Sequence, residues 1–209
     1  MRAVLLAIGV GLVLGTAAQM GPVLHPALRW VVALGVPWLV AAFVAGALVG
    51  DPARGALAGA AALVFGTLVY YANRVGDGGG AIQGVVLPLR GAPVVIGWCA
   101  AAAGGGALFG LLGAWWRRGG SLAFLVGTAL VSGALVGEAL LLTQEWSGRA
   151  AQLVLTAELA AGTALPFLLT RRRGLLVPVL VLAAIVALAV AVTEDSVRDA
   201  LRLMGWRGA

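Results

Sequence analysis

Seven long apolar stretches fill most of this 209-residue sequence, and short segments holding most of the charged residues separate them. An apolar run of about 18 or more residues can cross the hydrocarbon core of a bilayer, roughly 30 Å thick, as an α-helix. The sequence therefore predicts an all-α, polytopic membrane helix bundle with seven transmembrane helices. We expect these helices at residues 3–20, 30–50, 55–71, 91–115, 121–143, 150–170 and 175–193.

The composition supports a membrane domain and leaves no room for a soluble one. Hydrophobic residues make up 62% of the chain and charged residues 11%, whereas soluble domains carry about 25% charged residues. The connections between the apolar runs are short. We therefore predict one transmembrane domain over residues 1–193, with the lipid bilayer as its surroundings.

The tail over residues 194–209 has a different pattern. Thr193 is a suitable N-cap, and two acids in the first turn favour the helix dipole. Val197, Leu201 and Met204 then share one face. This pattern predicts an amphipathic C-terminal tail that forms a short interfacial helix.

Arginine is the source of all basic charge, and its distribution predicts the orientation. The sequence has 14 basic residues, none of them lysine, and a net charge of +6; with abundant Ala, Gly, Val and Leu this favours a bacterial genome of high GC content. Seven arginines fall at the N-terminus and in the second, fourth and sixth connections of the predicted bundle, and these sites face the cytoplasm by the positive-inside rule. We expect a multi-pass protein of a bacterial cytoplasmic membrane with a cytoplasmic N-terminus. Because these arginines lie in loops, we expect no nucleic-acid partner.

The first apolar run has two interpretations. Arg2 before an apolar stretch that ends near Ala18 resembles a secretory signal peptide. The same pattern suits an uncleaved first transmembrane helix, which we expect here.

Several functional classes lack the residues they need. Cys99 and His25 are the only cysteine and the only histidine, so the sequence predicts no metal site and no disulfide. It contains no His-Glu-x-x-His and no Gly-x-Ser-x-Gly motif. The glycine-rich segment in 72–90 lacks the Gly-Lys-Ser/Thr ending of a phosphate-binding loop. We expect no cofactor and no catalytic activity.

Glycines recur at four-residue spacing on five of the predicted helices, and such pairs let helix backbones approach closely in lipid. They indicate either a dimer interface or the internal packing of a compact bundle. The pairs are Gly11 and Gly15, Gly46 and Gly50, Gly55 and Gly59, Gly106 and Gly110, and Gly133 and Gly137.

Glu138 and Glu158 are the acids placed well inside apolar runs. Counted from the helix ends, they lie roughly 8 and 12 Å below the same, outer, membrane surface. A charged group inside the bilayer costs roughly 2.5–3.5 kcal/mol, so it usually faces a cavity, a partner or a transport pathway. Two close carboxyl groups would share a proton. The alternative is that each is an isolated carboxyl satisfied by a neighbouring Thr, Trp or backbone carbonyl.

Other polar and aromatic residues lie on the same side of the predicted bundle. Some of them are explained by the preference of Trp and Tyr for membrane interfaces. Together with the two acids they form a candidate ligand site, in which aromatic faces would favour a small cationic or amphipathic solute. The predicted site residues are Glu138, Glu158, Trp38, Tyr70, Tyr71, Asn73, Trp98 and Gln19.

Four stretches carry a resemblance to a family. These are WLVAAFVAG at 38–46, the stretch 63–71 that ends in two tyrosines, GGALFGLLGAWWR at 105–117, and GALVGEAL at 133–140. In this order they resemble a family of uncharacterised multi-pass membrane proteins of about 200 residues, found mainly in actinobacteria. The overall plan is loosely similar to the substrate-binding membrane subunits of energy-coupling-factor vitamin transporters, small bundles that usually have six helices. The seventh predicted span departs from that plan.

Two functional hypotheses follow from these patterns. The first is a small-solute binding or transport protein with an outer-leaflet pocket that contains the two carboxyl groups. The alternative is a non-transporting structural or accessory subunit that packs against a membrane protein partner.

Overall fold

The computed structural model describes residues 2–24, 31, 34–74, 92–170 and 173–203. Within these residues every regular element is an α-helix, which confirms the predicted all-α class. Each of the seven predicted runs contains a described helix, and six of these helices have 21 or more residues. The helices are α1 (Arg2–Leu24), α3 (Val36–Val49), α4 (Pro52–Arg74), α5 (Ala92–Arg118), α6 (Ser121–Glu145), α7 (Arg149–Leu169) and α8 (Arg173–Leu203).

Five of the described helices are long and apolar enough to cross a membrane. Two further apolar segments, Leu5–Ala18 and Val36–Val49, are shorter. The 14 residues of α3 extend about 21 Å at the helical rise, less than the hydrocarbon core of a bilayer. Seven crossings therefore remain a prediction. The five candidate spans are Pro52–Ala72, Pro93–Arg118, Ser121–Thr143, Arg149–Leu169 and Arg173–Thr193.

The short length of α3 has local causes at both ends. Leu34 and Gly35 lie outside the helix, so the predicted continuous helix over 30–50 is wrong at this point. Gly35 is the N-cap, and Pro37 follows in the first turn, where a missing N–H costs nothing. At the other end Gly50 adopts the left-handed conformation (φ 73°) and ends the helix.

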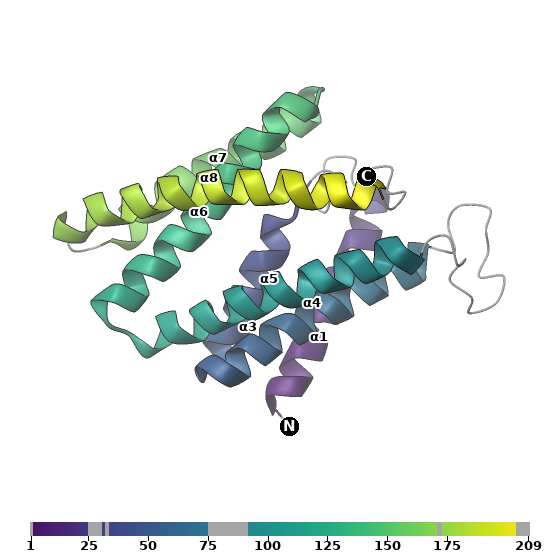
Figure 1. Cartoon of the computed structure of the whole chain (residues 1–209), viewed down its shortest axis with the longest axis horizontal. Helices are drawn as coiled ribbons and strands as arrows, with labels where there is room; N and C mark the ends of the chain where they lie inside the picture. Colours follow the sequence, from purple (N-terminus) through teal and green to yellow (C-terminus); the bar gives the residue numbers. More distant parts are fainter. Residues whose placement is uncertain (1, 25–30, 32–33, 75–91, 171–172, 204–209) are drawn as a thin grey trace.

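The helices form two groups (Figure 1), which contact each other mainly through α5 and α6. In the first group α4 packs on α1 and α5, and α3 packs on α4 and α5. In the second group α6 packs on α7 and α8. The main core cluster contains residues from both groups, so α3 and α6 meet in the interior. Its buried members are Val36, Ala42, Phe43, Leu63, Phe109 and Ala134.

The predicted glycine pairs pack mainly inside this bundle. A Cβ placed on Gly46 of α3 would lie 1.8 Å from the carbonyl oxygen of Gly110 on α5. Gly11 and Gly15 contact α4 in the same way, and Gly133 and Gly137 contact α8. Gly50 is the exception, with open space around it. Internal packing therefore accounts for these glycines, and a dimer interface is not needed to explain them.

The last helix is longer than the sequence predicts. α8 continues from Arg173 to Leu203 without a break, so the expectation that a new helix starts at Thr193 is wrong. The segment after Thr193 contains no Gly or Pro that would stop the helix through Leu203, and the Ser196 hydroxyl donates to the Val192 carbonyl 2.8 Å away, within the helix. The division into a domain over 1–193 and a tail over 194–209 stays a prediction.

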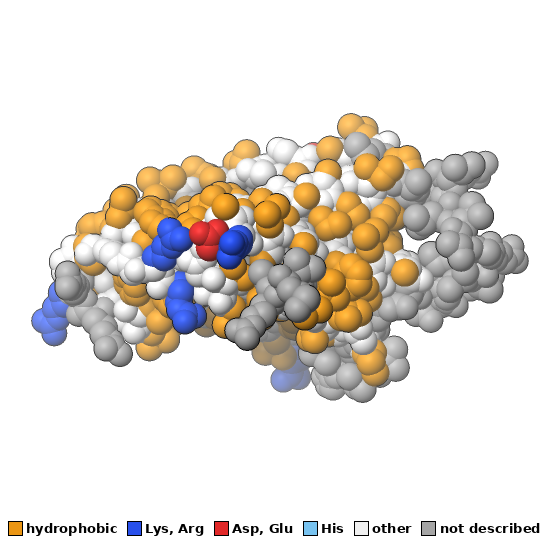
Figure 2. Space-filling view, turned by 90° about the horizontal axis from the view of Figure 1, so that it is seen from below, with side chains coloured by type: hydrophobic (Ala, Val, Ile, Leu, Met, Phe, Trp, Pro, Cys, Tyr) orange, Lys and Arg blue, Asp and Glu red, His pale blue; other side chains and the backbone are white. Residues whose placement is uncertain are grey.

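The surface has the character expected in lipid. Figure 2 shows apolar side chains over much of one face, with few charged groups and one acidic group lying between basic ones. Many large apolar side chains point outward on α7 and α8, among them Leu153, Leu168 and Leu188. In a bilayer these side chains contact acyl chains instead of water.

Candidate functional site at the start of α3

The first turn of α3 is held by an acid from a distant helix. Glu138 of α6 accepts hydrogen bonds from the backbone N–H of Gly35 and, at 2.7 Å, from that of Val36. A helix start leaves its first N–H groups without intrahelical partners. Gly35 has no side chain that could accept them, so the cap comes from α6. We call Gly35, Val36 and Glu138 the buried cap.

The buried cap lies in the interior of the bundle. Glu138 is 0% exposed and Val36 is 1% exposed. The positive end of the α3 dipole favours a negative charge here. Each buried polar group left without a hydrogen-bond partner costs about 1–3 kcal/mol, and a charged group costs more. These two hydrogen bonds give Glu138 a structural role, with backbone N–H donors that the isolated-carboxyl alternative did not include.

One hydrogen bond fixes the register of α6 and α7. The Ser132 hydroxyl donates to the carbonyl oxygen of Gly162, 2.5 Å away. Glu138 follows Ser132 by six residues along α6, and Glu158 precedes Gly162 by four residues along the antiparallel α7. At the helical rise the two acids differ by about 3 Å along the helix axes. Both side chains are buried, and Glu158 is 6% exposed.

The start of α3 also contacts the helix that carries Glu158. Leu34 packs against Leu142 of α6 and Leu155 of α7 in one buried cluster. Leu155 precedes Glu158 by one helical turn, and Leu34 directly precedes the capped Gly35. The segment from Leu34 to Val36 therefore contacts Glu138 itself and the turn of α7 that precedes Glu158.

Three of the predicted aromatic residues form a row beside the buried cap. Trp38, in the first turn of α3, meets Tyr70 of α4 edge to face, with ring centroids 6.4 Å apart and planes at 86°. Tyr70 meets Tyr71 in the same geometry at 5.1 Å. Such edge-to-face pairs are each worth about 0.5–1.5 kcal/mol beyond their burial. The Trp38 ring fits over Gly66, where an added Cβ would lie 3.0 Å from the ring atom Cζ3.

The other predicted residues are less informative. Trp98 lies half-buried on α5. Gln19 lies on α1 and Asn73 on α4, but their side chains fall outside the part of the chain that the structure describes. Among the described residues no group of three or more His, Cys, Asp or Glu side chains lies close enough to hold a metal ion. Membership of all eight residues in one ligand site stays a prediction.

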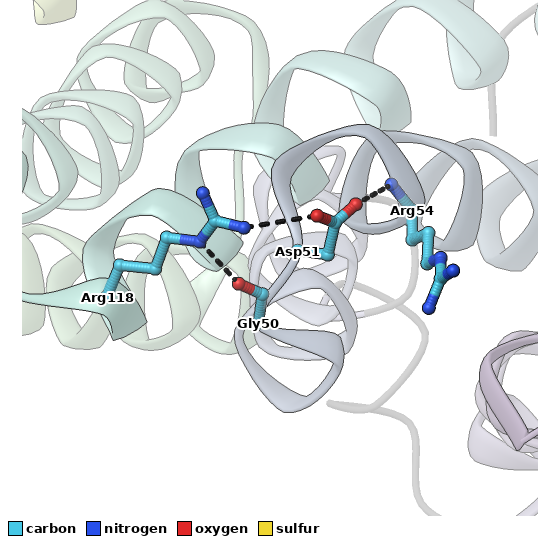
Figure 3. A network of polar contacts seen from close by, with 4 residues as sticks. All are labelled: Gly50, Asp51, Arg54 and Arg118. Atoms are coloured by element: carbon cyan, nitrogen blue, oxygen red, sulfur yellow. Dashed lines mark hydrogen bonds and ion pairs between the residues drawn. The ribbon is translucent and has the colours of Figure 1, made fainter.

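The opposite end of α3 carries a polar network that the sequence analysis did not single out (Figure 3). Arg118 of α5 donates from Nε to the Gly50 carbonyl at 3.0 Å and pairs with Asp51 at 3.1 Å. Arg117 donates to the Ala47 carbonyl at 3.3 Å. Asp51 in turn accepts the Arg54 N–H at 2.9 Å and so caps α4. We call Ala47, Gly50, Asp51, Arg54, Arg117 and Arg118 the exposed cap. In the sequence, part of this network is indicated by Asp51-Pro52, because an acid directly before a proline is typical of a helix N-terminus.

These features define a class of protein, a multi-pass α-helical membrane protein with buried acids in its helical interior. The chain belongs to a protein family described as "Family of unknown function (DUF6518)", whose pattern it matches over residues 1–198. This agrees with the predicted resemblance to an uncharacterised family. Comparison with curated proteins and with solved structures gives no match.

Proposed function

We propose that the protein binds a small cationic or amphipathic solute at the start of α3 and moves it across the membrane. The observation that supports this is the pair of buried acids at one level of two neighbouring helices, around a helix that begins inside the bundle. Ionisable groups within membrane spans commonly mark substrate or ion pathways. Transporters often place their sites where a helix is interrupted inside the bundle. The proposal has no chemical step and needs no cofactor.

The two acids take different parts in this proposal. Both oxygens of Glu138 accept N–H groups from the first turn of α3, so this carboxyl positions the helix. Glu158 is the carboxyl that attracts a cationic solute. Trp38 and Tyr70 supply aromatic faces beside the capped turn, which suits cation–π contact and apolar contact.

Ligand-induced thermal stabilisation of the purified chain tests the proposal. A ligand that binds only the folded state at 100 times its Kd stabilises it by about 2.7 kcal/mol. Cationic metabolites and vitamins are screened in neutral detergent, and each hit is titrated against Glu158→Gln, which removes the charge and keeps the size. We expect an affinity loss of at least about 30-fold, since loss of a buried charged partner typically costs about 2–5 kcal/mol.

Asp51→Asn is the matched control, because it makes the same chemical change at the exposed end of α3. It should leave ligand affinity unchanged. A hit whose affinity survives both Glu158→Gln and Glu138→Gln would show that the solute binds elsewhere.

The accessory-subunit alternative has one observation in its favour. The hydrogen bonds by which Glu138 caps α3 explain the presence of this buried acid without a bound solute. If no cationic or amphipathic solute raises the melting temperature, and the chain is stable only with a membrane protein partner, this alternative replaces the transport proposal.

We also propose that the membrane is the bacterial cytoplasmic membrane, with the N-terminus in the cytoplasm. The arginine distribution supports this orientation, with Arg117 and Arg118 inside. Exposed serines lie at the two ends of α6, Ser121 at its start and Ser147 just beyond its end. In a Cys99→Ala background, Ser147→Cys should react with an impermeant maleimide in intact cells and Ser121→Cys only after lysis. The reverse pattern would invert the orientation.

A further inference from the structure

Three exposed arginines gather where the end of α3, the start of α4 and the end of α5 meet. Arg54 lies in the first turn of α4, and Arg117 and Arg118 end α5. Asp51 is the acid among them and pairs with Arg118. Among the residues that the structure describes, three positive charges and one negative charge give this corner of the exposed cap a local charge of +2.

The two α5 guanidinium groups are held in place and keep donors available. Arg118 bonds to Gly50 and Asp51, and Arg117 bonds to Ala47. These bonds use two of the five N–H donors of Arg118 and one of the five of Arg117. The Arg54 guanidinium points away from Asp51 in Figure 3. Guanidinium donors suit the oxygens of phosphate groups.

The corner lies at the edge of the apolar surface. Arg118 is the last residue of the candidate span Pro93–Arg118, and Arg54 lies in the first turn of the span Pro52–Ala72. Leu57, one helical turn from Arg54, is 71% exposed, and Leu48 of α3 is 57% exposed. A ligand bound here would contact arginine with one end and outward-facing leucine with the other. A lipid, with an anionic headgroup and acyl chains, can make both contacts, whereas a soluble phosphate can make only the first.

We propose that this corner is a binding site for an anionic phospholipid, with Arg54 and Arg117 contacting the headgroup phosphate and Arg118 placed by Asp51 and Gly50. The acyl chains lie along the exposed leucines of α3 and α4. This site is separate from the start of α3, and neither proposal depends on the other.

Native mass spectrometry of the full chain in neutral detergent tests the lipid site. The probes are phosphatidylglycerol and phosphatidylcholine with identical acyl chains, and glycerol phosphate as the soluble headgroup. A surface arginine strengthens binding of anionic lipid by roughly fivefold. We expect phosphatidylglycerol to bind more tightly than phosphatidylcholine, and the Arg54→Gln, Arg117→Gln double variant to lose roughly 25-fold in affinity for it.

Arg149→Gln is the matched control, an exposed arginine at the start of α7 and at the other end of α6. It should leave the affinity unchanged, and the Arg54→Lys, Arg117→Lys pair should keep the preference for the anionic lipid. Equal affinity for the two lipids overturns the proposal, and so does an equal loss in Arg149→Gln. Binding of glycerol phosphate as tight as that of the lipid would mean a soluble phosphate site instead.

Discussion

The two ends of α3 are held by charged side chains from later helices, but in different surroundings. At the start, one fully buried carboxyl from α6 accepts two backbone N–H groups. At the end, Arg117 and Arg118 donate to the carbonyls of Ala47 and Gly50 from the surface, and the Arg118 side chain is 54% exposed. Each charge has the sign that the helix dipole favours at its end.

This difference in burial predicts that similar contacts contribute unequally to the free energy of unfolding. A buried donor that loses its acceptor has no water to replace it, and each hydrogen bond to a charged group is worth about 1.5–3 kcal/mol. An exposed pair exchanges its partner for water at little cost and contributes about 0–1 kcal/mol. The buried cap should therefore determine whether the start of α3 stays docked on α6, and the exposed cap should only refine the end of the helix.

The largest effect is expected at the buried cap. Glu138→Ala leaves the N–H groups of Gly35 and Val36 without their acceptor inside the bundle, and we expect it to lower the free energy of unfolding by about 3 kcal/mol. Titration of the purified protein with sodium dodecyl sulfate in mixed micelles, followed by circular dichroism, measures this change.

Glu138→Gln is the informative companion, because its amide oxygen can still accept one N–H while the charge is lost. It should fall between the wild type and Glu138→Ala. A loss below about 1 kcal/mol in Glu138→Ala would break the comparison, since the buried cap would then be no stronger than an exposed ion pair.

The middle of α3 offers a test of whether packing, and not the caps, holds the helix. A Cβ on Gly46 would lie 1.8 Å from the Gly110 carbonyl oxygen, so Gly46→Ala must push α3 away from α5. We expect a loss of about 2 kcal/mol, the range typical of overpacking. Gly104→Ala on α5 is the control, because nothing lies within 4 Å of its added Cβ.

Gly104→Ala should be neutral or stabilising by up to about 1 kcal/mol, because alanine favours the helix. The same micelle titration measures both variants. If Gly46→Ala matches Gly104→Ala, the close approach of α3 and α5 contributes nothing, and the two caps alone position the helix.

Much of the fold could be predicted because apolar periodicity and length are local properties of the chain. Each predicted run contains a described helix. The interruption before Val36 was missed because Leu34 and Gly35 are as compatible with an apolar run as their neighbours. The spacing of Gly50 predicts a packing pair with Gly46, but Gly50 instead ends α3 in the left-handed conformation, which spacing does not reveal. Hydropathy alone does not distinguish a spanning helix from a shorter one such as α3.

The site was predictable only in part, for a different reason. Burial of Glu138 and Glu158 follows from the cost of placing a carboxyl in lipid, and the register of Ser132 with Gly162 puts them at one level. The partner of Glu138 could not be predicted, because 103 residues separate it from Gly35 and no local pattern links them. The Trp38–Tyr70 contact likewise depends on how α3 and α4 cross.

A smaller effect is expected for the acid of the exposed cap. Asp51 accepts the Arg54 N–H and pairs with Arg118, so Asp51→Ala removes an N-cap and one ion pair. We expect a loss of about 1 kcal/mol, the usual value for an N-cap. Asp51→Asn keeps a capping oxygen and should recover most of it in the same titration. Equal losses in the two variants would assign the effect to the ion pair, against the capping role given to Asp51.

The smallest effect, and the sharpest test of the comparison, is the salt dependence of Arg118. Arg118→Gln should lower stability by less than about 1 kcal/mol, because its pair with Asp51 is exposed. The difference from the wild type should shrink between low salt and about 1 M salt, where the Debye length falls to about 3 Å. The loss in Glu138→Ala should stay constant over the same range, because salt does not reach a buried cap. Thermal unfolding in a nonionic detergent at several salt concentrations measures both, since an anionic detergent would itself screen the charges. A salt-dependent loss at Glu138, or a salt-independent one at Arg118, would show that the two ends of α3 do not differ in the way their burial indicates.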